Sequence, residues 1–153
     1  MKIALGSDHG GFRLKNEIKQ VFSSRGLTFT DLGTFSTDSV DYPDFALAVA
    51  EEVASGRCSL GIICCGTGIG VSIVANKVPG VRAAVCHDPY SARMAREHND
   101  ANVLTLGERV TGVGLAMDIV EAFLSAAFAG GRHAARVEKI RQIETKYCQG
   151  DRK

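Results

Sequence analysis

Charge imbalance, long apolar runs and C-x-x-C cysteine pairs are all missing from this sequence. Its 153 residues carry 18 Lys and Arg against 17 Asp and Glu, a formal net charge of +1. A chain without excess charge has no field that would recruit nucleic acid or an acidic membrane, so we expect neither as a partner and expect small molecules instead. No apolar run reaches the roughly 20 residues of a membrane span, and the one at the N-terminus is too short for a signal peptide.

Cysteine usage indicates a reducing compartment. The cysteines form no C-x-x-C pair, are odd in number and are too sparse for a disulfide scaffold; they are Cys58, Cys64, Cys65, Cys86 and Cys148. We therefore expect a cytoplasmic protein. The length, with 45% hydrophobic and 23% charged residues, fits one soluble globular domain over residues 1–153.

An apolar run at 60–65 ends in two cysteines and a glycine-rich segment, and a plausible helix follows at 71–77. The run is typical of a buried strand, and Gly66, Gly68 and Gly70 allow backbone conformations that side chains forbid. Backbone N–H groups at such a strand-loop-helix junction lack partners, and the helix dipole adds positive potential. The segment therefore predicts an anion site.

Three familiar interpretations of this loop fail on spacing. The dinucleotide fingerprint G-x-G-x-x-G and the Walker loop need residues that Gly70-Val71-Ser72 does not supply, and a cysteine phosphatase loop would need an arginine at 70 or 71. What remains is a thiol at the mouth of a backbone anion nest, where the thiolate is favoured and acts as base or nucleophile. The alternative is that both cysteines are small buried hydrophobes.

Strands and helices alternate along the whole chain. The expected strands are 2–7, 27–32, 60–65, 81–86 and 102–106, and the intervening helices cover 14–22, 43–53, 71–77, 90–97 and 115–124. This order predicts an α/β fold, a single-domain, doubly wound, Rossmann-like five-stranded parallel sheet. Such sheets bind ligands beyond the carboxyl ends of their strands, the edge at which Asp8, His9 and Cys65 fall.

A last helix is expected at 132–150, after Gly130-Gly131. Arg132 and Arg136 lie four residues apart near its positive end, where like charges repel. Either an anion binds there or the helix start is a solvated basic face. The apolar residues of this helix need a surface to cover, and a partner subunit could provide it; they are Val137, Ile140, Ile143 and Tyr147.

Five segments together resemble those of the type B ribose-5-phosphate isomerases, whose family also contains galactose- and allose-6-phosphate isomerases. They occur in the family's order over nearly the whole chain, and they are Gly6-Ser7-Asp8-His9-Gly10-Gly11, Asp41-Tyr42-Pro43, Cys65-Gly66-Thr67-Gly68-Ile69-Gly70, His98-Asn99-Asp100-Ala101-Asn102 and Gly130-Gly131-Arg132-His133.

The resemblance implies an aldose-ketose isomerase that needs no metal and no cofactor and acts on a sugar phosphate as a homodimer or a dimer of dimers. The leading hypothesis is the interconversion of ribose 5-phosphate and ribulose 5-phosphate through an enediolate. Two alternatives stay open. One is a hexose-6-phosphate isomerase for allose or galactose 6-phosphate, and the other is a non-catalytic sugar-phosphate sensor, because one fold hosts many functions.

The resemblance also implies a role for each matching residue. Cys65 is the expected general base, since Val71 stands where another branch of the family has a catalytic glutamate. The expected catalytic set is completed by Thr67 and His98, which assist ring opening, although plain cap roles would also fit them. The expected sugar contacts are Asp8, His9, Tyr42, Gly66, Gly68, Ile69, Gly70 and Asn99. The expected phosphate clamp is His9, Arg109, Arg132 and Arg136.

Topology adds one expectation about His98. It ends a helix, and every helix of a parallel sheet runs back to the amino edge, whereas Cys65 ends a strand at the carboxyl edge. A five-residue strand separates these edges by roughly 17 Å, well beyond hydrogen-bonding reach. If both residues serve one substrate, the site must be shared between two chains, with His98 coming from the partner.

Overall fold

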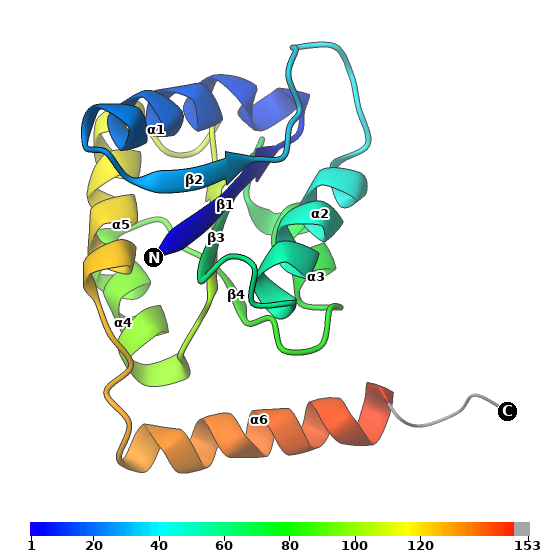
Figure 1. Ribbon diagram of the computed structural model, residues 1–153, viewed down its shortest axis with the longest axis vertical. Helices are drawn as coiled ribbons and strands as arrows, with labels where there is room; N and C mark the ends of the chain where they lie inside the picture. Colours follow the sequence, from blue (N-terminus) through cyan, green and yellow to red (C-terminus); the bar gives the residue numbers. More distant parts are fainter. Residues whose placement is uncertain (149–153) are drawn as a thin grey trace, which may run out of the picture.

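The computed structural model describes residues 1–148. Its core is one five-stranded sheet in the order β2-β1-β3-β5-β4, and every pairing in it is parallel (Figure 1). The strands are β1 (Lys2–Ser7), β2 (Thr28–Asp31), β3 (Leu60–Cys65), β4 (Ala83–Val85) and β5 (Val103–Gly107). This architecture confirms the predicted single-domain, doubly wound parallel sheet.

Helices cover both faces of the sheet and enclose two separate cores (Figure 1). On one face lie α1 (Phe12–Ser24), α4 (Pro89–Asn99) and α5 (Val113–Ser125); on the other lie α2 (Tyr42–Ala54) and α3 (Ile69–Ala75). Neighbouring residues of a strand point to opposite faces, so Cys64 enters the first core and Cys65 the second. Within residues 1–148, no helix combines the length and the apolar character that crossing a membrane requires.

Most element boundaries differ by one or two residues from the sequence expectation, and in β4 side chains replace backbone partners. β4 spans three residues rather than 81–86, since the amide oxygens of Asn102 and Asn76 accept the backbone N–H groups of Arg82 and Ala83, both at 2.8 Å. α3 begins at Ile69, two residues earlier than expected. The short helix η1 (His9–Gly11) also forms in the expected loop after β1.

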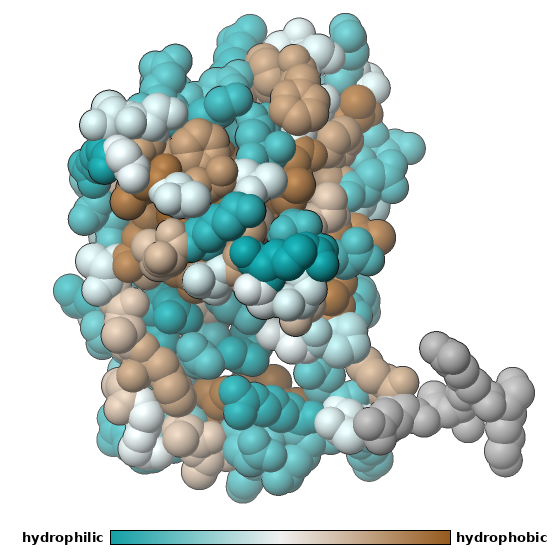
Figure 2. Space-filling model, in the orientation of Figure 1, coloured by the Kyte–Doolittle hydropathy of each residue, from teal (hydrophilic) through white to brown (hydrophobic). Residues whose placement is uncertain are grey.

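The last helix, α6 (Arg132–Cys148), lies across the amino edge of the sheet (Figure 1). Val137 is buried, whereas Ile140, Ile143 and Tyr147 are exposed. A cleft of about 330 Å³ separates α6 from the turn before β4, and a hollow is visible there in Figure 2. The dimer contact expected for this helix stays a prediction, and its expected residues 149 and 150 lie outside the described part of the chain.

Candidate active site

Cys65 is the last residue of β3 and only 6% exposed. Its Sγ accepts a hydrogen bond from the backbone N–H of Gly68 at 3.1 Å. Gly68 has φ +80, a left-handed conformation that favours glycine, and a Cβ there would lie 3.0 Å from the side chain of Val85. The loop therefore holds an N–H donor against the sulfur through a conformation that other residues rarely adopt.

Cys64 lies on the opposite face of the sheet from Cys65. It is fully buried in the core beneath α1, and this burial strongly raises the pKa of its thiol. Negative charge on Cys65 and Glu108 raises that pKa further. Cys64 is therefore a neutral core residue.

The loop after β1 packs directly on the glycine loop. The carboxylate of Asp8 accepts the N–H of Gly11 at 3.0 Å, and the Asp8 N–H donates to the carbonyl of Cys64 at 3.3 Å. A Cβ at Gly10 would lie 3.2 Å from the backbone nitrogen of Gly66, so the two loops nearly touch. This packing brings Asp8 and His9 to the same edge as Cys65, as expected.

Backbone hydrogen bonds also join the loop after β5 to this edge. The N–H groups of Glu108 and Arg109 donate to the carbonyls of Cys65 at 2.8 Å and Gly66 at 3.1 Å. The Arg109 side chain then lies over Gly66, where a Cβ would be 3.6 to 3.8 Å from the Cδ, Nε and Cζ atoms. Arg109 is exposed, so its guanidinium is available to an anion beside the thiol.

Two further expected residues border the glycine loop. The ring of Tyr42, at the start of α2, lies beside Gly70, where a Cβ would be 3.0 Å from two ring carbons. Thr67 is exposed, and its hydroxyl accepts the N–H of Ile69 at 3.3 Å. Thr67 therefore makes a local side-chain contact just before α3 and remains open to solvent.

The remaining expected residues gather at the opposite edge of the sheet. His98 and Asn99 form the last turn of α4, and Arg132 and Arg136 form the first turns of α6. Arg82 fixes the end of α4, because its Nε donates to the carbonyls of Asn99 and Asp100 and its Nη2 pairs with the Asp100 carboxylate at 2.8 Å.

His133 belongs to this amino-edge group, although the sequence did not single it out for a role. Its ring stacks on His98, with centroids 4.1 Å apart and planes 7° from parallel. Desolvation, together with the charges of His98, Arg132 and Arg136, lowers the pKa of His133 below its usual 6.5. A signal was present, since His133 lies four residues before the apolar Val137 and both are buried.

One chain thus holds the expected site residues in two separate groups. The carboxyl-edge group, which the structure brings together, consists of Asp8, His9, Tyr42, Cys65, Gly66, Thr67, Gly68, Ile69, Gly70 and Arg109. The amino-edge group, which lies at the other end of the sheet, consists of His98, Asn99, Arg132, Arg136 and the added His133.

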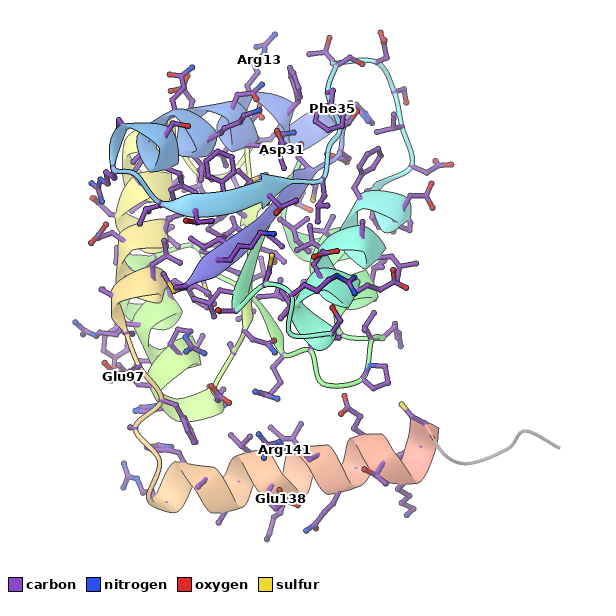
Figure 3. The ribbon with its side chains drawn as sticks, viewed as in Figure 1. Arg13, Asp31, Phe35, Glu97, Glu138 and Arg141 are labelled. Carbon is purple, nitrogen blue, oxygen red and sulfur yellow. The ribbon has the colours of Figure 1, made fainter. Side chains whose placement is uncertain are left out.

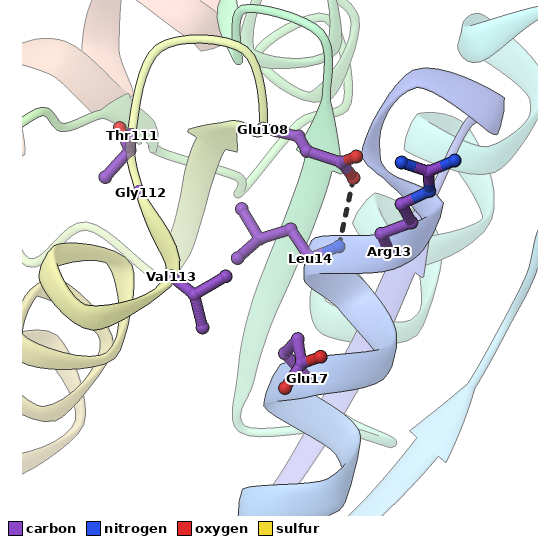
Figure 4. A pocket seen from close by; sticks show the side chains of 7 residues that line it. All are labelled: Arg13, Leu14, Glu17, Glu108, Thr111, Gly112 and Val113. Carbon is purple, nitrogen blue, oxygen red and sulfur yellow. Dashed lines mark hydrogen bonds between the residues drawn. The ribbon is translucent and has the colours of Figure 1, made fainter.

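A pocket of about 270 Å³ opens near the carboxyl edge, between the start of α1 and the turn before α5 (Figure 4). None of the expected site residues lines it. Glu108 reaches into this region, where its carboxylate accepts the N–H of Leu14 at 3.0 Å and so satisfies a free donor at the start of α1. Within residues 1–148, no group of three or more His, Cys, Asp or Glu side chains is arranged to hold a metal ion.

Known proteins resemble this chain in both sequence and fold. Residues 3–140 match the family model described as Ribose/Galactose Isomerase. Ribose-5-phosphate isomerase B of Escherichia coli is 53% identical over 143 residues, covering 94% of this chain and 96% of the relative. D-erythrulose-4-phosphate isomerase of Pectobacterium atrosepticum is 48% identical over 145 residues, covering 94% and 95%.

Among solved structures, ribose-5-phosphate isomerase B of Clostridium thermocellum superposes with a TM-score of 0.95 at 62% identity, covering 96% of this chain and 99% of that one. The sequence match and the structural match each extend over nearly the full length of both proteins. The chain therefore belongs to the ribose/galactose isomerase family of sugar-phosphate isomerases.

Proposed function

We propose that the protein interconverts ribose 5-phosphate and ribulose 5-phosphate, with Cys65 as the base that moves a proton between C2 and C1. After the sugar ring opens, the thiolate removes the C2 proton and an enediolate forms. Return of a proton to C1 gives the ketose. C1 is reduced as C2 is oxidised, so the reaction balances without an external oxidant or reductant.

The observation that carries this proposal is the contact between the Cys65 sulfur and the Gly68 N–H at 3.1 Å. A donor in this position solvates the sulfur while it carries negative charge. N–H donors that face an oxyanion stabilise it by about 3–4 kcal/mol each where they have been removed by mutation in other enzymes. Cys64, neutral and turned away, offers neither property.

We further propose that the site is completed by a second copy of the chain. His98, Arg132 and Arg136 lie at the amino edge, and no movement of side chains alone could carry them to Cys65 across the length of a strand. A two-fold dimer that sets the amino edge of one subunit against the carboxyl edge of the other would form two equal sites. In each, the partner's arginines would meet Arg109 around the phosphate, and its His98 would reach the ring oxygen.

The direct test is to offer several sugar phosphates to the purified protein and follow ketose formation. We expect the highest kcat/KM for ribose 5-phosphate, the substrate in the names of two of the relatives compared. Allose and galactose 6-phosphates test the hexose alternative. D-erythrulose 4-phosphate, itself a ketose whose conversion to the aldose is followed instead, tests the activity named for the Pectobacterium relative. Binding of these compounds without turnover of any would instead indicate a sensor.

A further inference from the structure

The proposed reaction does not use Lys15, although this lysine is completely buried. Its ammonium group makes an ion pair with Asp31 at 2.7 Å and donates to the carbonyl of Thr34 at 2.6 Å. The rings of Phe12 and Phe35 lie 5.7 and 5.0 Å from the nitrogen. A buried charge is costly unless it is fully paired, so the burial of Lys15 depends on these contacts.

The partners of Lys15 hold the start of the loop that joins β2 to α2, residues 32–41. Asp31 ends β2 and Phe35 lies just beyond it on the loop (Figure 3). The second oxygen of Asp31 pairs with Lys19 at 2.8 Å. Burial raises the pKa of Asp31, but the hydrogen bonds from both lysines outweigh that effect and lower it below 3.8. The Asp31 carboxylate is therefore charged at neutral pH.

This loop start is also paired with the strand end that carries the site. The N–H of Ser7 donates to the carbonyl of Gly33, and the N–H of Thr34 donates to the carbonyl of Ser7, both at 2.6 Å. Asp8 and His9 follow Ser7 directly. Lys15 thus binds the carbonyl of Thr34, and the carbonyl of Ser7 accepts the N–H of the same residue.

At its far end, the same loop contacts His9. The backbone N–H of Val40 donates to Nδ1 of the His9 ring at 3.2 Å. An imidazole nitrogen accepts a hydrogen bond only through its lone pair, so in the neutral ring the proton must be on Nε2. The loop therefore selects the tautomer that presents an N–H donor, rather than a lone pair, on the side of the ring away from the loop.

We propose that Lys15 is a positioning residue, which fixes loop 32–41 so that Val40 sets His9 as an Nε2–H donor for an oxygen of the sugar phosphate. The ligand part of this proposal rests on the proposed function. The tautomer part concerns the free protein and is tested without substrate.

The most direct variant is Val40→Pro, which removes the N–H donor, with Val40→Ala as the matched control that keeps it. Long-range proton–nitrogen NMR of the substrate-free protein should show His9 with a bare Nδ1 and a protonated Nε2. We expect Val40→Pro to give a mixture of tautomers and Val40→Ala to give the native pattern. A native pattern in Val40→Pro, or a protonated Nδ1 in the native neutral ring, would overturn the proposal.

Lys15→Met tests the role of Lys15 itself, because methionine fills a similar volume and leaves Asp31 paired with Lys19. The carbonyl of Thr34 then has no partner in a buried position, and we expect the loop to move and the His9 tautomers to mix. The control is Lys19→Met, which removes a half-exposed lysine from the same aspartate without touching Thr34. If Lys15→Met folds and keeps the native tautomer, Lys15 does not position His9.

Kinetics separate positioning from a general loss of stability. We expect KM for ribose 5-phosphate to rise about tenfold in Val40→Pro and about fivefold in Lys15→Met, with kcat changed by less than about twofold, because His9 binds but does not act at C1 or C2. Both controls should stay within about twofold of the native KM. Equal losses of kcat in all four variants would contradict a positioning role. If the protein turns over no sugar phosphate, the proposed function fails while the NMR result still decides the tautomer.

Discussion

At the carboxyl edge of the sheet, the loops after β1, β3 and β5 are joined by backbone hydrogen bonds, whereas at the amino edge the ends of α4 and α6 meet mainly through side chains. Asp8 N–H to Cys64, Glu108 N–H to Cys65 and Arg109 N–H to Gly66 tie three strand ends together within one chain. At the other edge, the ring of His98 on α4 stacks on that of His133 on α6. One backbone bond, from the N–H of Ala129 to the carbonyl of Glu97 at 2.9 Å, joins α4 to the segment before α6.

Under the proposed function, this difference would correspond to a division of chemical work. The carboxyl edge would hold the proposed base, Cys65, and its N–H donor from Gly68 in fixed positions, as stabilisation of a developing charge requires. The amino edge presents cations and imidazoles on helix ends, with exposed Ile140 and Ile143 beside them on α6. Fixed backbone geometry suits the reacting carbons, and long cationic side chains suit a phosphate that arrives across an interface.

Among the changes proposed here, removal of the proposed base at the carboxyl edge should have the largest effect on activity. We expect Cys65→Ala to lower kcat for ribose 5-phosphate by about 10²–10⁴-fold, the usual contribution of a positioned general base. Steady-state kinetics with the folded variant, checked by circular dichroism, measure the loss.

The matched control is Cys64→Ala, one residue earlier on the same strand. It faces the α1 core, so we expect a loss of stability of roughly 1 kcal/mol and nearly native activity. An inactive Cys64→Ala beside an active Cys65→Ala would show that the base has been assigned to the wrong face of the sheet.

A mixing experiment asks whether the two edges form one site. Cys65→Ala and His98→Ala proteins should each be nearly inactive. After they are unfolded and refolded together in equal amounts, half of the dimers should be mixed, and each mixed dimer should have one site with both native residues. We therefore expect about a quarter of the native activity. Mixed dimers, verified by mass spectrometry, that recover no activity would mean that His98 does not act on the partner's substrate.

The basic start of α6 should matter less than the base and more than any single exposed charge. We expect Arg132→Ala and Arg136→Ala each to raise KM for ribose 5-phosphate by about 10- to 100-fold and to weaken inorganic phosphate binding in parallel. Arg141→Ala is the control, since Arg141 lies on the same helix but pairs with Glu138 on the surface at 3.6 Å (Figure 3). Unchanged binding in the double variant would restore the interpretation of a solvated basic face.

The fold was predictable because its signals are local. Apolar runs and helical stripes located every strand and every α-helix of the described chain, and alternation along β3 placed Cys64 and Cys65 on opposite faces. The shortened β4 was not predictable, because the side chains that replace its ladder, Asn76 and Asn102, come from other segments. For the same reason, local patterns do not give the position of β5 between β3 and β4.

The candidate site divides in the same way. Motifs located Cys65, the glycine loop and the cations, but they assigned no role to Lys15 or His133. Lys15 sits beside the apolar stripe of α1, and its burial is decided by Asp31 and Thr34 from outside that helix. His133 gains its environment only when α6 packs against α4. Residues whose role depends on tertiary partners require a structure.

The smallest expected effect concerns the amino edge and its dependence on pH. Because the pKa of His133 is lowered in the folded protein, the folded state binds fewer protons than the unfolded state just below pH 6.5. Neutral His133 therefore leaves the folded protein at full stability above pH 6.5, and the free energy of unfolding decreases as pH falls through the folded pKa of this ring. Protonated His133 would also face Arg132 and Arg136. We expect the His133 proton NMR signal to titrate with a midpoint below 6.5, and hydrogen exchange in α6, corrected for intrinsic rates, to rise as pH falls through that midpoint. His133→Phe keeps a stacking ring that cannot be protonated, so exchange in its α6 should not change over this range. A midpoint at or above 6.5 in the native protein would show that the cations around this ring do not control its charge.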